Sequence, residues 1–209
     1  MTKAGPIPIT FARKGEGDIR ASAEIPHDVH VHEAELSYDE AVKLQAELAG
    51  AARTHAPWPV VSIVDGMTFV LIRLDSMKEL DALKPSSGHT ARDFVTLDEG
   101  WDPTLVSLYF YVMYPLSENE IQHISCRMIH GLLEDPATGS AASTLSSYLA
   151  LQRLGSNTES RTTTIAIQQG VKMGRPSEIG VEVKTEQGKV RSVSLSGNAV
   201  RVASGSIII

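Results

Sequence analysis

The chain opens with two short stretches in which apolar side chains alternate with small or charged ones. Residues 6–12 and 19–25 show this two-residue period on either side of a glycine-rich turn, which predicts an antiparallel β-hairpin. From Ser37 onward the apolar residues recur at three- and four-residue intervals, which is typical of the buried face of a helix. Ser37 and Glu40 have the spacing of a capping box, and Gly50 is expected to end this helix.

Runs of β-forming residues dominate the middle of the chain. Residues 60–64 and 67–74 flank Asp65-Gly66, a pair that predicts a two-residue hairpin turn. A short helix is expected at residues 76–83, with Ser76 as its N-cap. Residues 84–104 are the loosest part of the sequence. We place a boundary here, so that residues 1–103 and 104–209 are expected to form two lobes.

The second half of the chain has strand patterns on both sides of one helical pattern. Strands are expected at residues 105–114 and 123–130, and a helix is expected to begin near Ser140. Four later strands are expected at residues 162–168, 178–184, 189–195 and 199–209. Together these patterns predict an α+β protein.

The segment with the clearest chemical potential is a loop that runs into this helix, residues 134–142 (EDPATGSAA). Thr138 and Ser140 are good N-cap residues. The small side chains here, including Gly139 and Ala141, leave backbone N–H groups open at the helix start. A helix N-terminus carries a partial positive charge and binds anions such as a carboxylate.

Two carboxylates, Glu134 and Asp135, come just before this helix start. An acid/base group beside an anion-binding helix end suits proton transfer on a small carboxylic acid. The same residues also form an ordinary turn and helix cap, in which Glu134 and Asp135 only interact favourably with the helix dipole. Local chemistry leaves both interpretations open.

The EDPATGSAA segment resembles the signature of the phenazine-biosynthesis (PhzF-type) isomerase family, whose members have the diaminopimelate-epimerase fold. Further segments that resemble the family are residues 2–9, 58–62, 169–177 and 193–202. The resemblance therefore covers nearly the whole chain.

This resemblance implies a two-lobed α+β fold in which antiparallel sheets curve around a helix. Family members begin with a segment that bears a catalytic glutamate and with a turn that opens the central helix of the first lobe. Neither part has a counterpart in this sequence. We therefore expect the first lobe, residues 1–103, to be incomplete and to expose apolar surface that a second copy covers in a homodimer.

For the site, the resemblance implies Asp135 as the catalytic acid/base group, with no metal, nucleotide or pyridoxal cofactor. His130 lies where the family usually has Phe-Ala-Pro and this chain has Ile-His-Gly, so an imidazole is expected near the pocket. Arg175 is expected either to hold a substrate carboxylate or to pair with an acidic side chain. The residues expected to bind the small-molecule substrate are Glu134, Thr138, Gly139, Ser140, Ala141, His130 and Arg175.

Three functions fit these observations. The first is a cofactor-independent isomerase that moves a proton on a small unsaturated or carboxylic-acid metabolite. The second is an enzyme of cyclase or pericyclase type on the same scaffold, which needs shape and one hydrogen bond more than a second base. The third is a non-catalytic truncated relative that binds a small acid or a paralogue.

Composition and charge argue against two kinds of binding partner, nucleic acids and membranes. A net charge of −6 without a dense basic block argues against nucleic-acid binding. The sequence shows no signal segment and no apolar run long enough to span a membrane, so a cytoplasmic protein is expected. The single cysteine, Cys126, is expected to be a half-buried thiol on a strand rather than a nucleophile.

Three histidines, His27, His30 and His32, lie close together in the sequence. His30 and His32 would share one strand face and offer two metal ligands. No third metal-binding residue occurs at a sequence spacing typical of metal sites. We therefore expect an exposed polar edge and no metal site. Trp101, in the loose segment, is expected either to stack on a ligand or to pin its loop to the fold.

Overall fold

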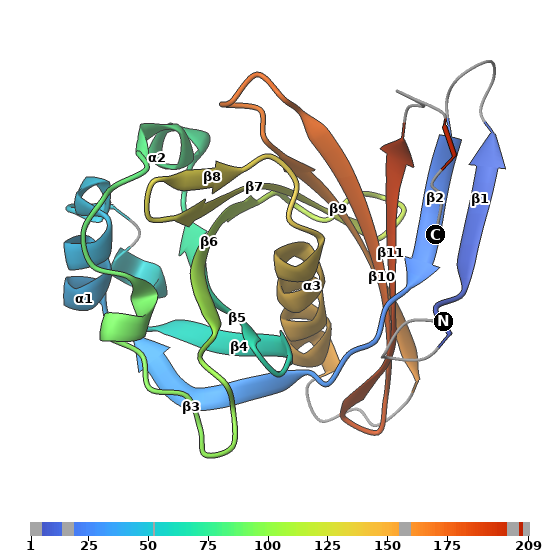
Figure 1. The fold of residues 1–209 in the computed structure, drawn as a ribbon, viewed down its shortest axis with the longest axis horizontal. Helices are drawn as coiled ribbons and strands as arrows, with labels where there is room; N and C mark the ends of the chain where they lie inside the picture. The colour runs from blue at the N-terminus through green and yellow to red at the C-terminus, as the bar shows by residue number, and fades with distance from the viewer. Residues whose placement is uncertain (1–5, 14–18, 52, 155–159, 200–204, 207–209) are drawn as a thin grey trace.

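The computed structural model describes residues 6–13, 19–51, 53–154, 160–199 and 205–206. Within them, eleven strands form one sheet in the order β1-β2-β11-β10-β9-β7-β6-β5-β4-β3, with β8 paired to β7. Figure 1 shows that this sheet curves around the long helix α3, while α1 and α2 lie outside the curve.

The strands are β1 Ile9–Arg13, β2 Ile19–Glu24, β3 His30–Leu36, β4 Trp58–Val64, β5 Met67–Leu74, β6 Leu105–Met113, β7 Ile121–His130, β8 Leu133–Asp135, β9 Arg161–Gln169, β10 Ser177–Glu186 and β11 Lys189–Ala199. The helices are α1 Tyr38–Leu44, α2 Met77–Ala82 and α3 Gly139–Leu154, with short 3₁₀ turns η1 Ala46–Leu48, η2 Arg53–His55 and η3 Ala91–Asp93. The strand predicted at residues 199–209 falls largely outside the described residues.

The local turn and cap signals are confirmed. Strands β1 and β2 pair as an antiparallel hairpin, and β4 and β5 pair across Asp65-Gly66, where Gly66 has a φ of 79°. Ser37 and Ser76 each close a capping box with a glutamate three residues later. These features depend only on neighbouring residues, which explains why the sequence predicts them.

Helix α1 ends earlier than predicted, at Leu44 rather than near Gly50. Gln45 leaves the helical region, with φ −144° and ψ 92°. Its buried side-chain amide donates a hydrogen bond to the backbone oxygen of Lys84 at 2.9 Å. A tertiary contact therefore ends the helix before the glycine does.

The predicted boundary near residue 104 falls in the segment between β5 and β6. Strands β5 and β6 lie on either side of it and pair in parallel from Met67–Leu105 to Leu74–Val112. Parallel neighbours need a crossover connection, and the loose segment with α2 and η3 provides it. A second parallel pair, β7 and β9, is joined by the crossover through α3, so the sheet is mixed rather than antiparallel throughout.

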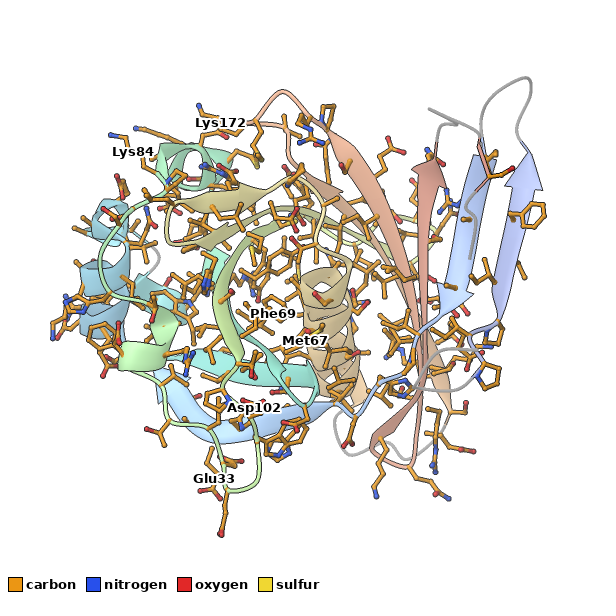
Figure 2. The ribbon with its side chains drawn as sticks, viewed as in Figure 1. Glu33, Met67, Phe69, Lys84, Asp102 and Lys172 are labelled. Atoms are coloured by element: carbon orange, nitrogen blue, oxygen red, sulfur yellow. The ribbon has the colours of Figure 1, made fainter. Side chains whose placement is uncertain are left out.

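Both faces of the strands β4, β5 and β6 are buried. Val70 and Ile72 of β5 belong to one apolar cluster, with α1 and α2. Phe69 and Leu71 belong to a second cluster, with α3, and Figure 2 shows Phe69 beside that helix. The expectation of an uncovered concave face is therefore wrong for these strands, because α3 from the second half of the chain fills it.

Helix α3 is enclosed by the sheet, as predicted for a helix beginning near Ser140. Most of its surface is buried, and its small residues allow the strands to approach closely. Fully buried residues of α3 are Ala141, Ala142, Ser143, Thr144, Leu145, Ser146, Ser147 and Ala150. No helix in the described part of the chain is long and apolar enough to cross a lipid bilayer.

Exposed apolar side chains occur on the edge strand β1, and also at Leu132 and Leu133, where the chain turns from β7 into β8. Ile9 is 63% exposed and Phe11 is 72% exposed. Large apolar side chains on an edge strand are unusual for an uncovered surface. This edge lies on the side of the sheet where β2 pairs with β11 (Figure 1).

Candidate active site

The hairpin of β7 and β8 carries the EDPATGSAA loop to the start of α3. His130 pairs with Leu133, and Gly131 takes the positive φ of 59° that this tight turn requires. Asp135 of β8 lies opposite Met128 of β7. Met128 is two residues before His130, so both point to the same face of β7. Because Met128 packs in the cluster around α3, this face is the one directed at the helix.

Glu134 does not face the helix start. Its Oε1 and Oε2 accept hydrogen bonds from Arg127 Nε at 2.7 Å and Nη2 at 2.8 Å. Both side chains are buried, and Arg127 Nη1 also donates to the backbone oxygens of Leu80 and Leu83 at the end of α2. This bidentate ion pair occupies the carboxylate of Glu134, a residue expected from the sequence to bind substrate.

Asp135 is held at the start of α3. Its Oδ2 accepts a hydrogen bond from Thr138 Oγ1 at 2.7 Å, and its Oδ1 accepts one from the N–H of Ala137 at 3.3 Å. The side chain is half-buried. Two local donors thus fix the orientation of the carboxylate.

Gln169, at the end of β9, organises this loop from behind. Its Nε2 donates to the backbone oxygen of Asp135 at 2.7 Å and to Thr138 Oγ1 at 2.9 Å. Its Oε1 accepts from the Thr138 N–H at 3.3 Å and from Tyr109 at 3.2 Å. Gln169 is fully buried. It lies in segment 169–177, which resembles the family, but the sequence alone did not identify it as a site residue.

Gly170 brings the next turn against the same loop. It has a φ of 76°, and a Cβ atom here would lie 2.7 Å from the backbone oxygen of Pro136 and closer still to that of Arg175. Only glycine combines this φ with so close a backbone approach. The turn at residues 170–175 therefore packs closely against the loop before α3.

The first turn of α3 offers backbone donors. The N–H of Ala142 is the first that bonds back, to the oxygen of Thr138 at 3.0 Å. The N–H groups of Gly139, Ser140 and Ala141 therefore have no acceptor within the helix. Their partial positive charge lies next to the Asp135 carboxylate.

An open groove of about 730 Å³ begins at this helix start. Ala137 and Gly139 line it together with residues of strands β9, β10, β11 and β2 and with Ile9 of β1, whereas Asp135, two residues before Ala137, does not line it. Groove-lining side chains of β10 and β11 include Ser177, Glu178, Ile179, Leu195 and Asn198. A groove of this size accommodates a small organic acid.

The other predicted residues are placed as follows. His130 Nδ1 lies 2.7 Å from Ser107 Oγ, so the imidazole is engaged beside the site rather than in the groove. Arg175 is exposed, and its side chain forms no ion pair within the described residues. The two residues after Arg175, Pro176 and Ser177, line the groove, whereas Arg175 itself does not.

Cys126 is buried and unsuited to nucleophilic chemistry. Burial raises the pKa of its thiol to about 12. Its sulfur lies 2.8 Å from the Tyr109 hydroxyl, whose own pKa is raised well above 10 by burial and then by Cys126. The prediction of a thiol with a structural role is confirmed, although the side chain is fully rather than half buried.

A single curved sheet around a buried helix, with a carboxylate and open N–H groups at the start of that helix, is an α+β architecture shared with known structures. The fold is similar to that of a PhzF-family phenazine biosynthesis protein from Bacillus anthracis, with a TM-score of 0.70, 17% identity and coverage of 99% of this chain and 67% of that chain. It is also similar to that of a predicted epimerase from Pseudomonas aeruginosa, with a TM-score of 0.59, 21% identity and coverage of 95% and 64%.

The sequence profile of the phenazine biosynthesis-like protein family matches residues 1–205, and the chain belongs to this family. The trans-2,3-dihydro-3-hydroxyanthranilate isomerase of Pseudomonas aeruginosa is 28% identical over 208 residues, which are 98% of this chain and 64% of that protein. An uncharacterised isomerase of Mesorhizobium japonicum is 41% identical over 76 residues, which are 36% of this chain and 24% of that protein. The chain thus spans less than two thirds of these curated relatives.

Proposed function

We propose that this chain is an isomerase that uses Asp135 to transfer a proton on a small unsaturated carboxylic acid, without a cofactor. The substrate carboxylate would bind the N–H groups of Gly139 and Ser140, the two residues at the helix start that are not fully buried. Asp135 would then donate or accept a proton on the carbon skeleton lying in the groove.

One observation carries this proposal: the 2.7 Å hydrogen bond between Asp135 and Thr138 beside the open helix start. Thr138 is itself fixed by Gln169, so the carboxylate has a defined direction. A catalytic carboxylate needs such fixation because proton transfer depends on heavy-atom distances near 3 Å.

The groove and the relatives together suggest the substrate class. Apolar side chains such as Ile179 and Leu195 lie beside polar ones such as Ser177 and Asn198, which suits an unsaturated ring with polar substituents. The Pseudomonas aeruginosa relative is named as an isomerase of a dihydro-hydroxyanthranilate. A cyclic unsaturated acid of this type is the substrate class that we propose.

We further propose that a second copy of the chain covers the open groove. Ile9 and Phe11 of β1 are exposed apolar residues, and Ile9 lies at the groove itself. A homodimer that buries them would also exclude water from Asp135, which strengthens the interaction between the substrate and the helix start.

The test is Asp135→Asn, measured with trans-2,3-dihydro-3-hydroxyanthranilate and a panel of related cyclic unsaturated acids. Loss of the acid/base group should lower turnover about 10²–10⁴-fold while the melting temperature changes little, because Asn keeps a hydrogen-bond acceptor for Thr138. Asp75→Asn, an exposed carboxylate paired with His55, serves as the matched control and should keep full activity.

Turnover in deuterium oxide separates the chemical alternatives. Solvent deuterium should enter the product of a proton-transfer isomerase, whereas a purely pericyclic reaction incorporates none at the rearranging carbons. Unchanged turnover in Asp135→Asn, or no turnover of any acid by the wild-type protein, would contradict the proposal.

A further inference from the structure

A second cluster of chemically reactive side chains lies on β3, outside the site described above. His30 and His32 of β3 meet Asp98, which comes from the segment before β6. Their ligand atoms, two imidazole nitrogens and one carboxylate oxygen, all lie within 4.8 Å of one another. Asp98 Oδ2 is 2.6 Å from His30 Nε2 and 3.7 Å from His32 Nδ1.

The surroundings fix His32 in the form that binds a metal. Its Nε2 lies 2.8 Å from Ser62 Oγ, which lies 2.6 Å from Thr68 Oγ1 in a buried chain of hydroxyl groups. Its Nδ1 accepts a hydrogen bond from the N–H of Asp98 at 3.3 Å. These partners assign the proton to Nε2 and the lone pair to Nδ1, on the side where Asp98 lies.

Asp98 is oriented in a similar way. Its Oδ1 accepts a hydrogen bond from the N–H of Glu33 at 3.1 Å, which leaves Oδ2 directed at the two histidines. Hydrogen bonds from a second layer of residues typically orient the ligands of metal sites in this manner.

An aromatic wall closes one side of the cluster. Trp101 stacks on His30, with ring centroids 4.7 Å apart and an interplanar angle of 16°, and meets His32 edge-on at 5.5 Å. Buried His32 forms the floor, while the side chains of His30 and Asp98 are 35% and 28% exposed. The cluster is therefore shielded on one side and accessible to ions on the other.

We propose that His30, His32 and Asp98 bind a divalent transition-metal ion, with Zn²⁺ as the ion that best suits the donors. Two imidazoles and one carboxylate, with a position left for water, form a common zinc ligand set. Tetrahedral bonds of 2.0–2.1 Å separate ligand atoms by about 3.3 Å. The separations of 2.6 Å and 3.7 Å lie on either side of this value.

The expectation of no metal site depended on the lack of a third donor close in sequence. Asp98 supplies that donor from 66 residues after His32. On binding, the ion would replace the long 3.3 Å hydrogen bond at His32 Nδ1 and the short contact between His30 and Asp98.

The ion would tie the loop that carries Asp98 and Trp101 to the start of β3. In Figure 2, Glu33 of β3 and Asp102 of this loop lie at the lower edge of the molecule, whereas Figure 1 places β8, which leads to the start of α3, in the upper part. We therefore assign the metal a stabilising role, independent of turnover at Asp135.

The test is isothermal titration of the untagged, chelator-treated protein with ZnCl₂, together with melting curves. The wild-type protein should bind one equivalent per chain, and its melting temperature should rise. His30→Gln and Asp98→Asn should each weaken the affinity at least about tenfold, in line with the 10–100-fold losses typical of perturbed metal sites. Both changes keep a hydrogen-bonding side chain at a partly exposed position, so folding should be retained.

His55→Gln is the matched control. His55 and Asp75 form the same imidazole–carboxylate contact, at 2.7 Å, but within the described residues no third donor stands beside them. Zinc affinity should be unchanged in this variant, and Mg²⁺ should not raise the melting temperature of the wild-type protein. Co²⁺ should give visible absorption bands that His30→Gln removes.

Three results would overturn the site. They are no zinc binding by the wild-type protein, a change of less than about tenfold in His30→Gln and Asp98→Asn, and an equal loss in His55→Gln. Activity is not part of any of these measurements, so failure of the proposed isomerase function would leave the metal proposal unaffected.

Discussion

Gln169 and Gly170 are the two residues that decide where Asp135 lies. Gln169 holds the loop before α3 through hydrogen bonds to Asp135 and Thr138. Gly170 allows the following turn to press against Pro136. Neither residue lines the groove. Both therefore act by positioning the loop that carries Asp135.

Gly170→Ala should destabilise the protein and misplace the loop. The backbone has a φ of 76°, and the new Cβ would meet the oxygens of Pro136 and Arg175. The expected loss of unfolding free energy is more than about 2 kcal/mol, because conformational strain and overlap add. Denaturant unfolding measures it.

Gly174→Ala is the control for this prediction. Gly174 has a similar φ of 69°, but no atom lies within 4 Å of the position of its Cβ. Only the conformational cost of about 1 kcal/mol should remain. Equal losses in the two variants would show that the contact with Pro136 does not matter.

At this scale the sequence predicts the candidate acid, the helix start and the cap residues, because they are neighbours in the chain. It does not predict the ion-pair partner of Glu134, because Arg127 meets Glu134 only through the β7–β8 register. Gln169 was missed because its hydrogen bonds to Asp135, Thr138 and Tyr109 form only in the folded structure.

Among elements, the pairing of β7 with β8 also anchors α2. Arg127 connects the β7–β8 hairpin to α2. It forms an ion pair with Glu134 on β8 and donates hydrogen bonds to the backbone oxygens of Leu80 and Leu83 at the end of α2. The C-terminal carbonyls of a helix need such donors. The ion pair therefore connects the site loop to the outer helical layer.

Arg127→Met should cost about 3–5 kcal/mol, because it leaves the buried Glu134 carboxylate and two backbone oxygens without their donor. The double variant Arg127→Met with Glu134→Leu should recover part of this loss, since no buried charge remains. Urea unfolding of the wild type and of both variants tests this. A double variant less stable than Arg127→Met would refute the explanation by an unpaired charge.

Element prediction succeeded where the pattern is local. The β1–β2 and β4–β5 hairpins, the capping box of Ser37 and the N-cap at Ser76 were predicted correctly. The length of α1 was not, because a contact between Gln45 and Lys84 ends it. The parallel pairing of β5 with β6 was also missed, because no residue pattern distinguishes it from two separate sheets.

For the whole molecule, the exposed apolar side chains of β1 beside the groove form a surface that a second chain can cover. A second copy of the chain is our proposal, and it predicts a melting temperature that rises with protein concentration, together with a dimeric native mass. Phe11→Glu should shift the mass towards the monomer, because a charge would be buried in the interface. Sedimentation and melting curves over a range of concentrations measure both.

Leu116→Glu, in the connection between β6 and β7, is the control for this prediction. Leu116 is also exposed, at 47%, but it is not part of β1 and does not line the groove. Its native mass should equal that of the wild type. A wild-type protein that is monomeric at every concentration would contradict the homodimer.

The sequence by itself determined the features that act over a few residues: the hairpins, the caps, the loop–helix segment with Asp135, and the family. Only the tertiary structure decided which residues meet across the sheet. It paired β5 with β6 across the expected lobe boundary, paired Glu134 with Arg127, and brought Asp98 to His30 and His32. The physical reason is that local preferences depend on neighbouring residues, whereas these contacts form only when distant segments are packed around α3.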